Sequence, residues 1–132
     1  MPRPSALRWE FAARFGLPGD ADDRPPSAAS GRANLDHRYA GPVSANAFAA
    51  PDGLAQLLGN VWEWTATPFG PHPDFAADPY AEYSAPWFGD HRVVRGGSFA
   101  TRTRLAHHRF RNFYLPERSD LFVGFRTCAL SE

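Results

Sequence analysis

The stretch 59-GNVWEWT-65 places one carboxylate, Glu63, between two tryptophans and directly after a Gly-Asn pair. Two adjacent large aromatic side chains predict that Glu63 is at least partly buried. A buried carboxylate needs a cation, an arginine or several hydrogen-bond donors. The backbone carbonyls around Gly59 and Val61 would complete an oxygen cage of the kind that calcium prefers. In either case Glu63 would hold a loop in place rather than act in catalysis.

The competing partner for this carboxylate is a guanidinium, and Arg95 and Arg126 are the candidates. Arginine supplies every basic side chain of the protein, because the sequence contains no lysine. Arginine presents a planar fork of donors that suits carboxylates. A further group clusters in the last third of the chain: Arg102, Arg104, Arg109, Arg111 and Arg118. This cluster either faces an anionic substrate or forms a solvated, salt-bridged surface.

The chain of 132 residues has room for one domain, taken as residues 1–132. Its 14 basic and 14 acidic residues give a formal charge of zero, so charge gives no reason to expect a nucleic acid or a membrane surface as partner. The single cysteine excludes an internal disulfide framework and indicates a reduced, cytoplasmic setting. We find neither a signal-peptide pattern nor an apolar run of roughly 18 residues.

Glycine, proline and aromatic residues predict a backbone that turns often and is held together by ring packing. The spacing of Trp9, Ala12 and Ala13 predicts a short helix that ends at Gly16. A mobile loop is expected over 17–33, where Pro, Asp, Ser and Gly dominate. Short strands are predicted at 41–48, 91–100 and 121–130, and irregular backbone pinned by buried rings at 68–86. Together these elements indicate a loop-rich α+β domain.

Residues that could carry chemistry by themselves form no recognisable catalytic pattern. Ser98 follows two glycines but lacks the GxSxG pattern, so a structural bend is the better interpretation. Cys128 lies in an apolar pattern typical of a buried cysteine. None of the histidines forms an HxxxH, HExxH or HxH pair, so this chain is not expected to make a mononuclear metal triad. They are His37, His72, His91, His107 and His108.

Three motifs in this order resemble the sulfatase-modifying-factor superfamily, whose founding member is the formylglycine-generating enzyme. They are GLAQLLGNVWEWT, RVVRGGSFATR and FRNFYLPERSDLFVGFRTC, with RWEFAAR and GRANLD upstream. The resemblance covers nearly the whole chain. It implies a C-type-lectin-like fold with little regular secondary structure, often holding calcium.

The formylglycine-generating branch is not the one that the sequence favours. The resemblance implies two copper-binding cysteines shortly after GGS, and Thr101 and Ala106 occupy those positions. Without thiolates, copper(I) loses its soft ligands, so neither copper nor formylglycine formation is expected.

The residues within these motifs are instead similar to those in the C-terminal domain of non-heme iron sulfoxide synthases of ergothioneine biosynthesis and their selenoneine-forming relatives. That resemblance implies oxygen-dependent joining of a thiol or selenium donor to trimethylhistidine. Iron(II) would be bound by a DinB-like helical domain, in cis or in trans, because this chain lacks HxxxH. The chain alone would then be inactive, and an N-terminal truncation of the domain is one interpretation.

The resemblance also implies site residues. The substrate tract falls on Arg111, Asn112, Phe113 and Tyr114. An amide such as Asn112 can bind a carboxylate or an imidazole, and an aromatic such as Phe113 can face a quaternary ammonium. Tyr114 stands where synthases that use γ-glutamylcysteine have an acidic residue, so the donor stays open. The candidate tyrosine proton donors are Tyr80, Tyr83 and Tyr114.

The calcium ligands implied by the resemblance are Gln56, Gly59, Val61 and Glu63. A second family calcium site begins at Asn34 and Leu35, but its completing loop is short, and no second ion is expected. Two other functions stay open: a non-catalytic C-type-lectin-like module that binds a ligand or partner, and a divergent formylglycine-generating oxidase.

Overall fold

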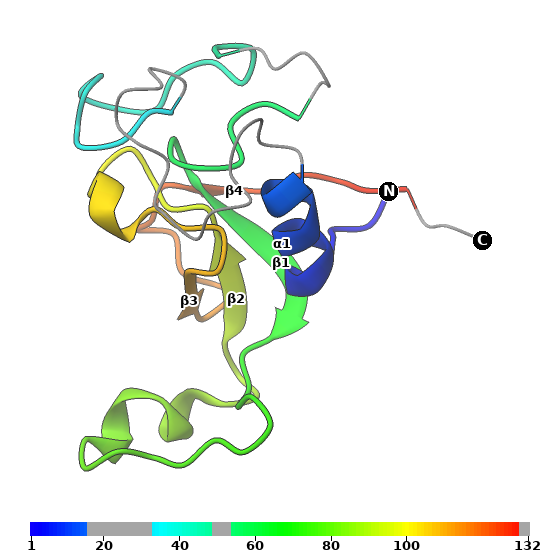
Figure 1. Cartoon of the computed structure of the whole chain (residues 1–132), viewed down its shortest axis with the longest axis vertical. Helices are drawn as coiled ribbons and strands as arrows, with labels where there is room; N and C mark the ends of the chain where they lie inside the picture. The colour runs from blue at the N-terminus through cyan, green and yellow to red at the C-terminus, as the bar shows by residue number, and fades with distance from the viewer. Residues whose placement is uncertain (16–32, 49–53, 130–132) are drawn as a thin grey trace.

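The computed structural model describes residues 1–15, 33–48 and 54–129. Its centre is a four-stranded sheet in the order β3-β2-β1-β4. The strands are β1 (Trp62–Pro68), β2 (Arg92–Arg95), β3 (Arg111–Tyr114) and β4 (Val123–Gly124). One helix, α1 (Ala6–Phe15), packs against β1 and β2 (Figure 1). Three single-turn 3-10 helices are η2 (Ala81–Tyr83), η3 (Ala85–Trp87) and η4 (Thr103–Leu105). The predicted loop-rich α+β class is confirmed.

Strand register decides which side chains share a face of the sheet. β1 and β2 are antiparallel with Glu63 opposite Arg95, and β2 and β3 are antiparallel with Arg95 opposite Arg111. β4 pairs with β1 in parallel. Because successive side chains of a strand point to opposite faces, Glu63, Arg95 and Arg111 lie on one face. This face, against which α1 packs, is called the helix face below.

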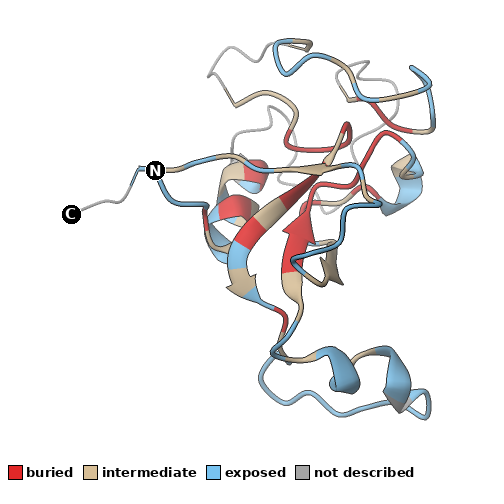
Figure 2. Cartoon of the chain, turned by 180° about the vertical axis from the view of Figure 1, so that it is seen from behind, coloured by how far each residue is buried: buried red, intermediate tan, exposed pale blue. Residues whose placement is uncertain are grey.

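The core lies between α1 and the sheet. Trp9 and Ala13 of α1 cluster with Leu57 and Leu58, which precede β1. Figure 2 shows the buried residues gathered on α1 and the two central strands. Burial of Trp9 and Ala13 follows the predicted helical spacing, although the helix begins earlier in the chain than its motif.

Two glycines bring the GNVWEWT and RGGS motifs into contact. The N–H of Gly59 donates to the carbonyl of Gly96 over 2.8 Å. Both glycines have positive φ, at 79° and 90° respectively. A Cβ on Gly96 would lie 2.7 Å from the Leu57 carbonyl oxygen, and one on Gly59 would lie 2.3 Å from that of Asn34. Only glycine therefore fits either position without movement of the backbone.

The strand predicted at 41–48 is wrong. Residues 45–48 form a turn, closed by the N–H of Ala47 donating to Ser44 O. Both backbone groups of Val43 bond instead to the side-chain amide of Asn60, at 2.8 and 3.1 Å. The Asn60 side chain thus supplies the two hydrogen bonds that a neighbouring strand would otherwise give to Val43.

Two further expectations are corrected in part. The strand predicted at 121–130 shortens to Val123–Gly124, whereas the one at 91–100 is confirmed as β2 running into the Gly-Gly bend. The loop expected over 17–33 lies, apart from residue 33, outside the described residues.

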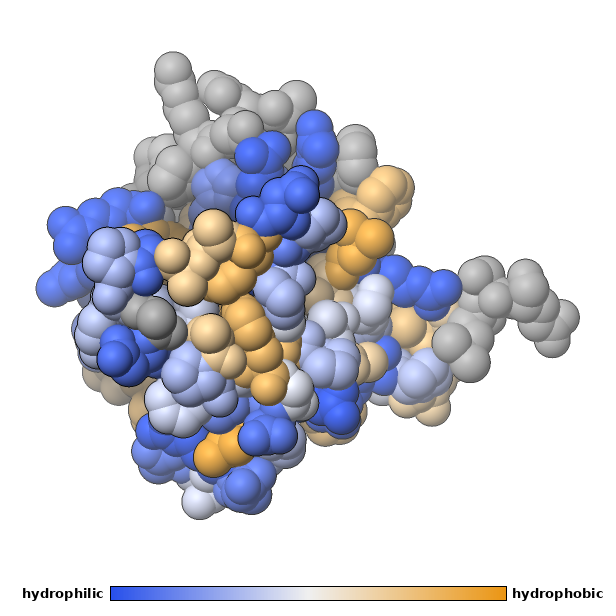
Figure 3. Space-filling view, turned by 90° about the horizontal axis from the view of Figure 1, so that it is seen from below, coloured by the Kyte–Doolittle hydropathy of each residue, from blue (hydrophilic) through white to orange (hydrophobic). Residues whose placement is uncertain are grey.

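The β1–β2 arm, defined as residues 69–91, extends away from the sheet (Figure 1). It is irregular, as predicted, but most of its rings are not buried. Phe69 is buried, whereas Phe75, Tyr80, Tyr83 and Trp87 are exposed. Seen from below, at the end that carries the arm, hydrophobic residues form a strip among hydrophilic ones (Figure 3). Proline breaks up regular pairing here, and within the described residues no second layer covers the arm.

No helix within the described ranges combines the length and the apolar character needed to cross a membrane.

Candidate functional site

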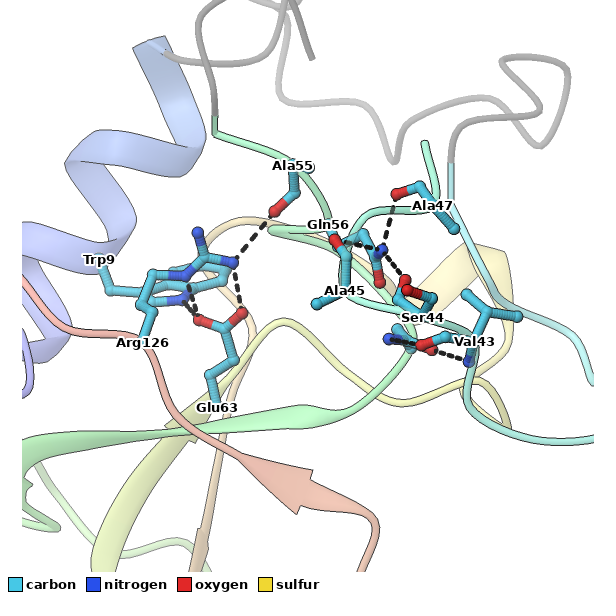
Figure 4. A network of polar contacts seen from close by, with 10 residues as sticks. Trp9, Val43, Ser44, Ala45, Ala47, Ala55, Gln56, Glu63 and Arg126 are labelled. Atoms are coloured by element: carbon cyan, nitrogen blue, oxygen red, sulfur yellow. Dashed lines mark hydrogen bonds and ion pairs between the residues drawn. The ribbon is translucent and has the colours of Figure 1, made fainter. Parts of the chain in front are cut away.

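Glu63 is the centre of a saturated polar network (Figure 4). Only 7% of the residue is exposed. Arg126 forms a bidentate pair with it, at 2.6 Å through Nε and 2.5 Å through a terminal nitrogen. The indole N–H of Trp9 donates to the same carboxylate over 2.6 Å. The predicted burial of Glu63 is confirmed, and so is an arginine partner, which is Arg126 rather than Arg95.

Arg95 uses a different carboxylate, although it lies opposite Glu63 in the sheet. Its guanidinium pairs with Glu10 of α1 and donates to the Arg109 carbonyl over 2.7 Å. It also lies over the Trp9 ring, 5.6 Å from the ring centre. Glu63 and Arg95 are therefore a cross-strand pair whose two members bind consecutive residues of the helix. Trp9 donates to Glu63, and Glu10 pairs with Arg95. Sequence analysis missed Glu10, although its place beside a buried tryptophan was a signal.

Two of the four implied calcium ligands, Gln56 and Glu63, point into separate polar networks (Figure 4). The oxygens of Glu63 already accept three donors. The amide nitrogen of Gln56 donates toward three carbonyls at 2.7 to 3.0 Å, those of Ser44, Ala45 and Ala47. A calcium ion at Glu63 would have to displace a guanidinium, so the donor set does not fit the ion as it stands. Calcium binding there stays a prediction.

The substrate tract forms β3, and its side chains divide between the two faces. Arg111 and Phe113 point to the helix face, where both contact Phe69 of the arm. Arg111 lies 5.1 Å from the centre of that ring, and Phe113 stacks on it at 3.8 Å. Asn112 and Tyr114 point to the opposite face, where the Asn112 amide donates to the Tyr114 phenol oxygen over 2.9 Å. The four residues are contiguous but make two separate pairs.

Two of the candidate tyrosines, Tyr80 and Tyr83, lie in the β1–β2 arm, and the third, Tyr114, ends β3. Tyr83 contacts the Phe113 ring edge-on at 6.4 Å, and Tyr80 lies 6.3 Å from Tyr83. Burial raises the pKa of Tyr114 above its ordinary value of 10.0, and the nearby Arg118 opposes this shift. A phenol with a raised pKa keeps its proton at neutral pH. Among the three candidates, Tyr114 is the one whose phenol oxygen is fixed by a hydrogen bond from the Asn112 amide.

The positions where cysteines would bind copper have other roles here. The hydroxyl oxygen of Thr101 accepts the N–H of Ser98 over 2.9 Å, which closes the bend after the two glycines. Ala106 is buried. Ser98 is therefore held as part of a turn, in agreement with the structural interpretation.

Among the described residues, no group of three or more His, Cys, Asp or Glu side chains could hold a metal ion. His107 and His108 lie in or next to a turn and stack on each other at 4.4 Å. The described residues thus offer no set of side chains for iron, which the resemblance assigns to a separate helical domain.

A pocket of about 500 Å³ lies between α1 and the helix face. Its charged and polar walls come from α1, β1, the arm, β2, the segment before β3 and the first residue of β3. They include Glu10, His72, Arg95, Arg109 and Arg111. Burial lowers the pKa of Arg111 from its ordinary value. Sequence analysis named Arg111 as a substrate ligand but did not foresee this pocket, because its walls are far apart in the chain.

The sequence matches the sulfatase-modifying factor enzyme 1-like domain over residues 3–130. It is 38% identical to hercynine oxygenase of Mycolicibacterium smegmatis, over 93% of this chain and 32% of that protein. It is 43% identical to ergothioneine biosynthesis protein 1 of Schizosaccharomyces pombe, over 54% of this chain and 10% of that protein. The chain thus spans about a third or less of these relatives.

Solved structures support the fold. Variable protein 1 of Treponema denticola superposes with a TM-score of 0.67 at 24% identity, over 93% of this chain and 45% of that one. Because the family match covers residues 3–130 and the fold agrees, the chain belongs to the sulfatase-modifying factor enzyme 1-like domain family.

Proposed function

We propose that this chain is the substrate-binding C-terminal part of an ergothioneine- or selenoneine-type synthase, acting in the cytoplasm. Such an enzyme would use oxygen to form a C–S or C–Se bond on trimethylhistidine. The observation that carries the proposal is the likeness to hercynine oxygenase along 93% of the chain. A DinB-like domain, in cis or in trans, would supply iron(II) and its redox chemistry, so the chain alone would be inactive.

The role of β3 in this proposal is to orient trimethylhistidine. Asn112 and Tyr114 offer an amide and a protonated phenol side by side, which suits a carboxylate or an imidazole. Phe113 offers less ring surface to a quaternary ammonium than the sequence suggests, because one face of its ring is covered by Phe69. We therefore assign the main contact to Asn112, with Tyr114 as the donor of a proton or hydrogen bond. The identity of the chalcogen donor is left open.

Titration calorimetry of the chain with trimethylhistidine tests this assignment. We expect saturable binding, weakened about tenfold in Asn112→Ala because a hydrogen bond to a charged group is lost. Asn46→Ala, at an exposed turn, is the matched control and should bind like the wild type. Equal affinity in Asn112→Ala would remove this residue from the site, and absence of saturation in the wild type would overturn the proposal.

The alternative is a non-catalytic ligand- or partner-binding module. Among the described residues, no three or more His, Cys, Asp or Glu side chains are grouped to hold a metal ion, and this agrees with either function. Adding a DinB-like iron-binding domain to the chain separates the two. Oxygen-dependent turnover of trimethylhistidine with a thiol or selenium donor supports the synthase. If no such turnover occurs when the chain is combined with the protein product of each neighbouring gene, the module is supported. A divergent formylglycine-generating oxidase would have to act without thiolates at Thr101 and Ala106.

A further inference from the structure

The β1–β2 arm presents four large aromatic rings to solvent, those of Phe75, Tyr80, Tyr83 and Trp87. Between 42% and 66% of each of these residues is exposed. Figure 2 shows most of the arm in the colour of exposed residues, where it projects beyond the sheet. Large rings gathered on one exposed segment are typical of a contact surface, because their burial against a partner removes apolar area from water.

The rings are held in a fixed arrangement. The indole N–H of Trp87 donates to the main-chain oxygen of Glu82 over 2.9 Å. The N–H of Tyr83 donates to the carbonyl of Tyr80 over 3.2 Å, and the two rings lie 6.3 Å apart. Tyr83 also meets the Phe113 ring of β3 edge-on at 6.4 Å, which ties the arm to the sheet. A surface that is already ordered loses less conformational entropy when a partner binds.

The arm is also acidic. Residues 69–91 contain four carboxylates and neither arginine nor lysine. All four are exposed and belong to Asp74, Asp78, Glu82 and Asp90. Within the described part of the chain, none of the four forms an ion pair. Asp78 accepts the N–H of Tyr80 over 2.9 Å. Carboxylates without a cationic partner therefore alternate with exposed rings along the same segment.

We propose that the β1–β2 arm docks onto a partner protein whose contacting face is rich in arginine. A guanidinium can lie over a tyrosine or tryptophan ring and donate to a carboxylate at the same time. The chain shows this arrangement elsewhere, because Arg118 lies 5.2 Å from the centre of the Tyr114 ring and pairs with Asp120. The arm carries the ring and carboxylate halves of the same arrangement, so the partner supplies the guanidiniums.

The charge of the arm also decides between partners. Two copies of this chain docked arm to arm do not fit, since two sets of unpaired carboxylates would face each other. A lysine-rich face would satisfy the carboxylates but would use the rings less well, because an ammonium does not stack as a planar guanidinium does. The docking surface goes beyond the proposed function, and it requires neither trimethylhistidine nor its contact Asn112.

Fluorescence anisotropy with a short dye-labelled peptide of alternating arginine and glycine tests the proposal. We expect saturable binding that weakens as sodium chloride screens the charges. The same peptide with lysine in place of arginine should bind several-fold more weakly, and one with glutamate should not bind.

Two variants separate the contribution of the rings from that of the charge. Tyr80→Ala should weaken binding of the arginine peptide about threefold, as expected for the loss of an exposed cation–π contact. Glu82→Gln should also weaken it, and this variant keeps the bond to Trp87, which uses the main-chain oxygen. Glu117→Gln, which removes an exposed carboxylate outside the arm, is the matched control and should bind like the wild type.

Weaker binding in both arm variants supports the docking surface. The proposal is overturned by absence of saturation with the arginine peptide, by equal affinity for the lysine peptide, or by wild-type affinity in Tyr80→Ala. Sedimentation velocity of the chain alone gives a further check. A dimer that dissociates in Tyr80→Ala would mean that a second copy occupies the arm, and would overturn the proposal as well.

Discussion

Arg126 and Arg95 both pair with a carboxylate in the helix-face region, yet their surroundings differ. Arg126 meets a carboxylate that is also bonded to Trp9, and its bidentate geometry uses both oxygens of Glu63. Among the described residues, Arg95 has one carboxylate partner, a buried Nε without an acceptor, and a second guanidinium nearby. Both oxygens of the first carboxylate accept hydrogen bonds, whereas the second pair leaves one buried donor without an acceptor among the described residues. The two pairs thus differ in how completely their buried polar atoms are satisfied.

The largest expected effect comes from opening the closed network. Arg126→Met leaves Glu63 buried without its guanidinium and should lower the free energy of unfolding by about 3 kcal/mol. This is the lower end for a broken buried pair, because Arg126 is itself 26% exposed. Urea unfolding followed by tryptophan fluorescence measures it.

Arg118→Met is the control for that variant. It breaks a pair with Asp120 that is also bidentate, at 2.7 and 2.8 Å, but both partners are exposed. The loss of stability should be much smaller than in Arg126→Met, because solvent screens an exposed pair. Equal losses in the two variants would show that burial does not distinguish these pairs.

A second prediction concerns calcium, which must compete with Arg126 for Glu63. Any calcium-dependent gain in stability should therefore be larger in Arg126→Met than in the wild type. It should reach about 1.4 kcal/mol at roughly ten times the Kd. Melting temperatures with calcium and with a chelator give the comparison. Glu63→Gln should abolish the gain, and a gain that survives in this variant would place the ion elsewhere.

The smallest expected effect is at Asp36, a half-buried carboxylate that contrasts with both buried pairs. Hydrogen bonds from the Thr103 side chain and backbone lower the pKa of Asp36 below its ordinary value of 3.8. The resulting stabilisation is complete above that value and is lost as the pH falls through the lowered pKa. Thr103→Val should therefore be slightly less stable than the wild type at neutral pH.

The difference between Thr103→Val and the wild type should disappear in acid. Melting temperatures from pH 7 to about pH 2 test this sign. Thr127→Val, at an exposed position, should show no pH-dependent difference. A constant gap for Thr103→Val across the range would mean that the hydroxyl acts on packing and not on the carboxylate.

Sequence could predict what depends on neighbouring residues. The helical spacing of Trp9 and Ala13 indicated their burial, and the flanking tryptophans indicated that of Glu63. The motif order was enough to predict the family. The GGS bend followed from glycine chemistry, since Gly96 has positive φ.

What sequence could not predict depends on contacts between distant segments. Arg95 and Glu10 are 85 positions apart, and no local pattern pairs them. The division of the substrate tract depends on β3 being an extended strand, which sends Asn112 and Phe113 to opposite faces. Whether the rings of the β1–β2 arm are exposed depends on whether another part of the structure packs over them. Amino-acid composition does not predict such packing.

The Glu63 network also bears on how the chain folds. Its carboxylate bonds to Trp9, 54 positions away, and to Arg126, 63 positions away. Contacts of such separation form only after long loops have closed, which slows folding. Helix α1 and the segment around Arg126 are therefore expected to join the strand in a late, cooperative step. Loss of either one by proteolysis should release the other.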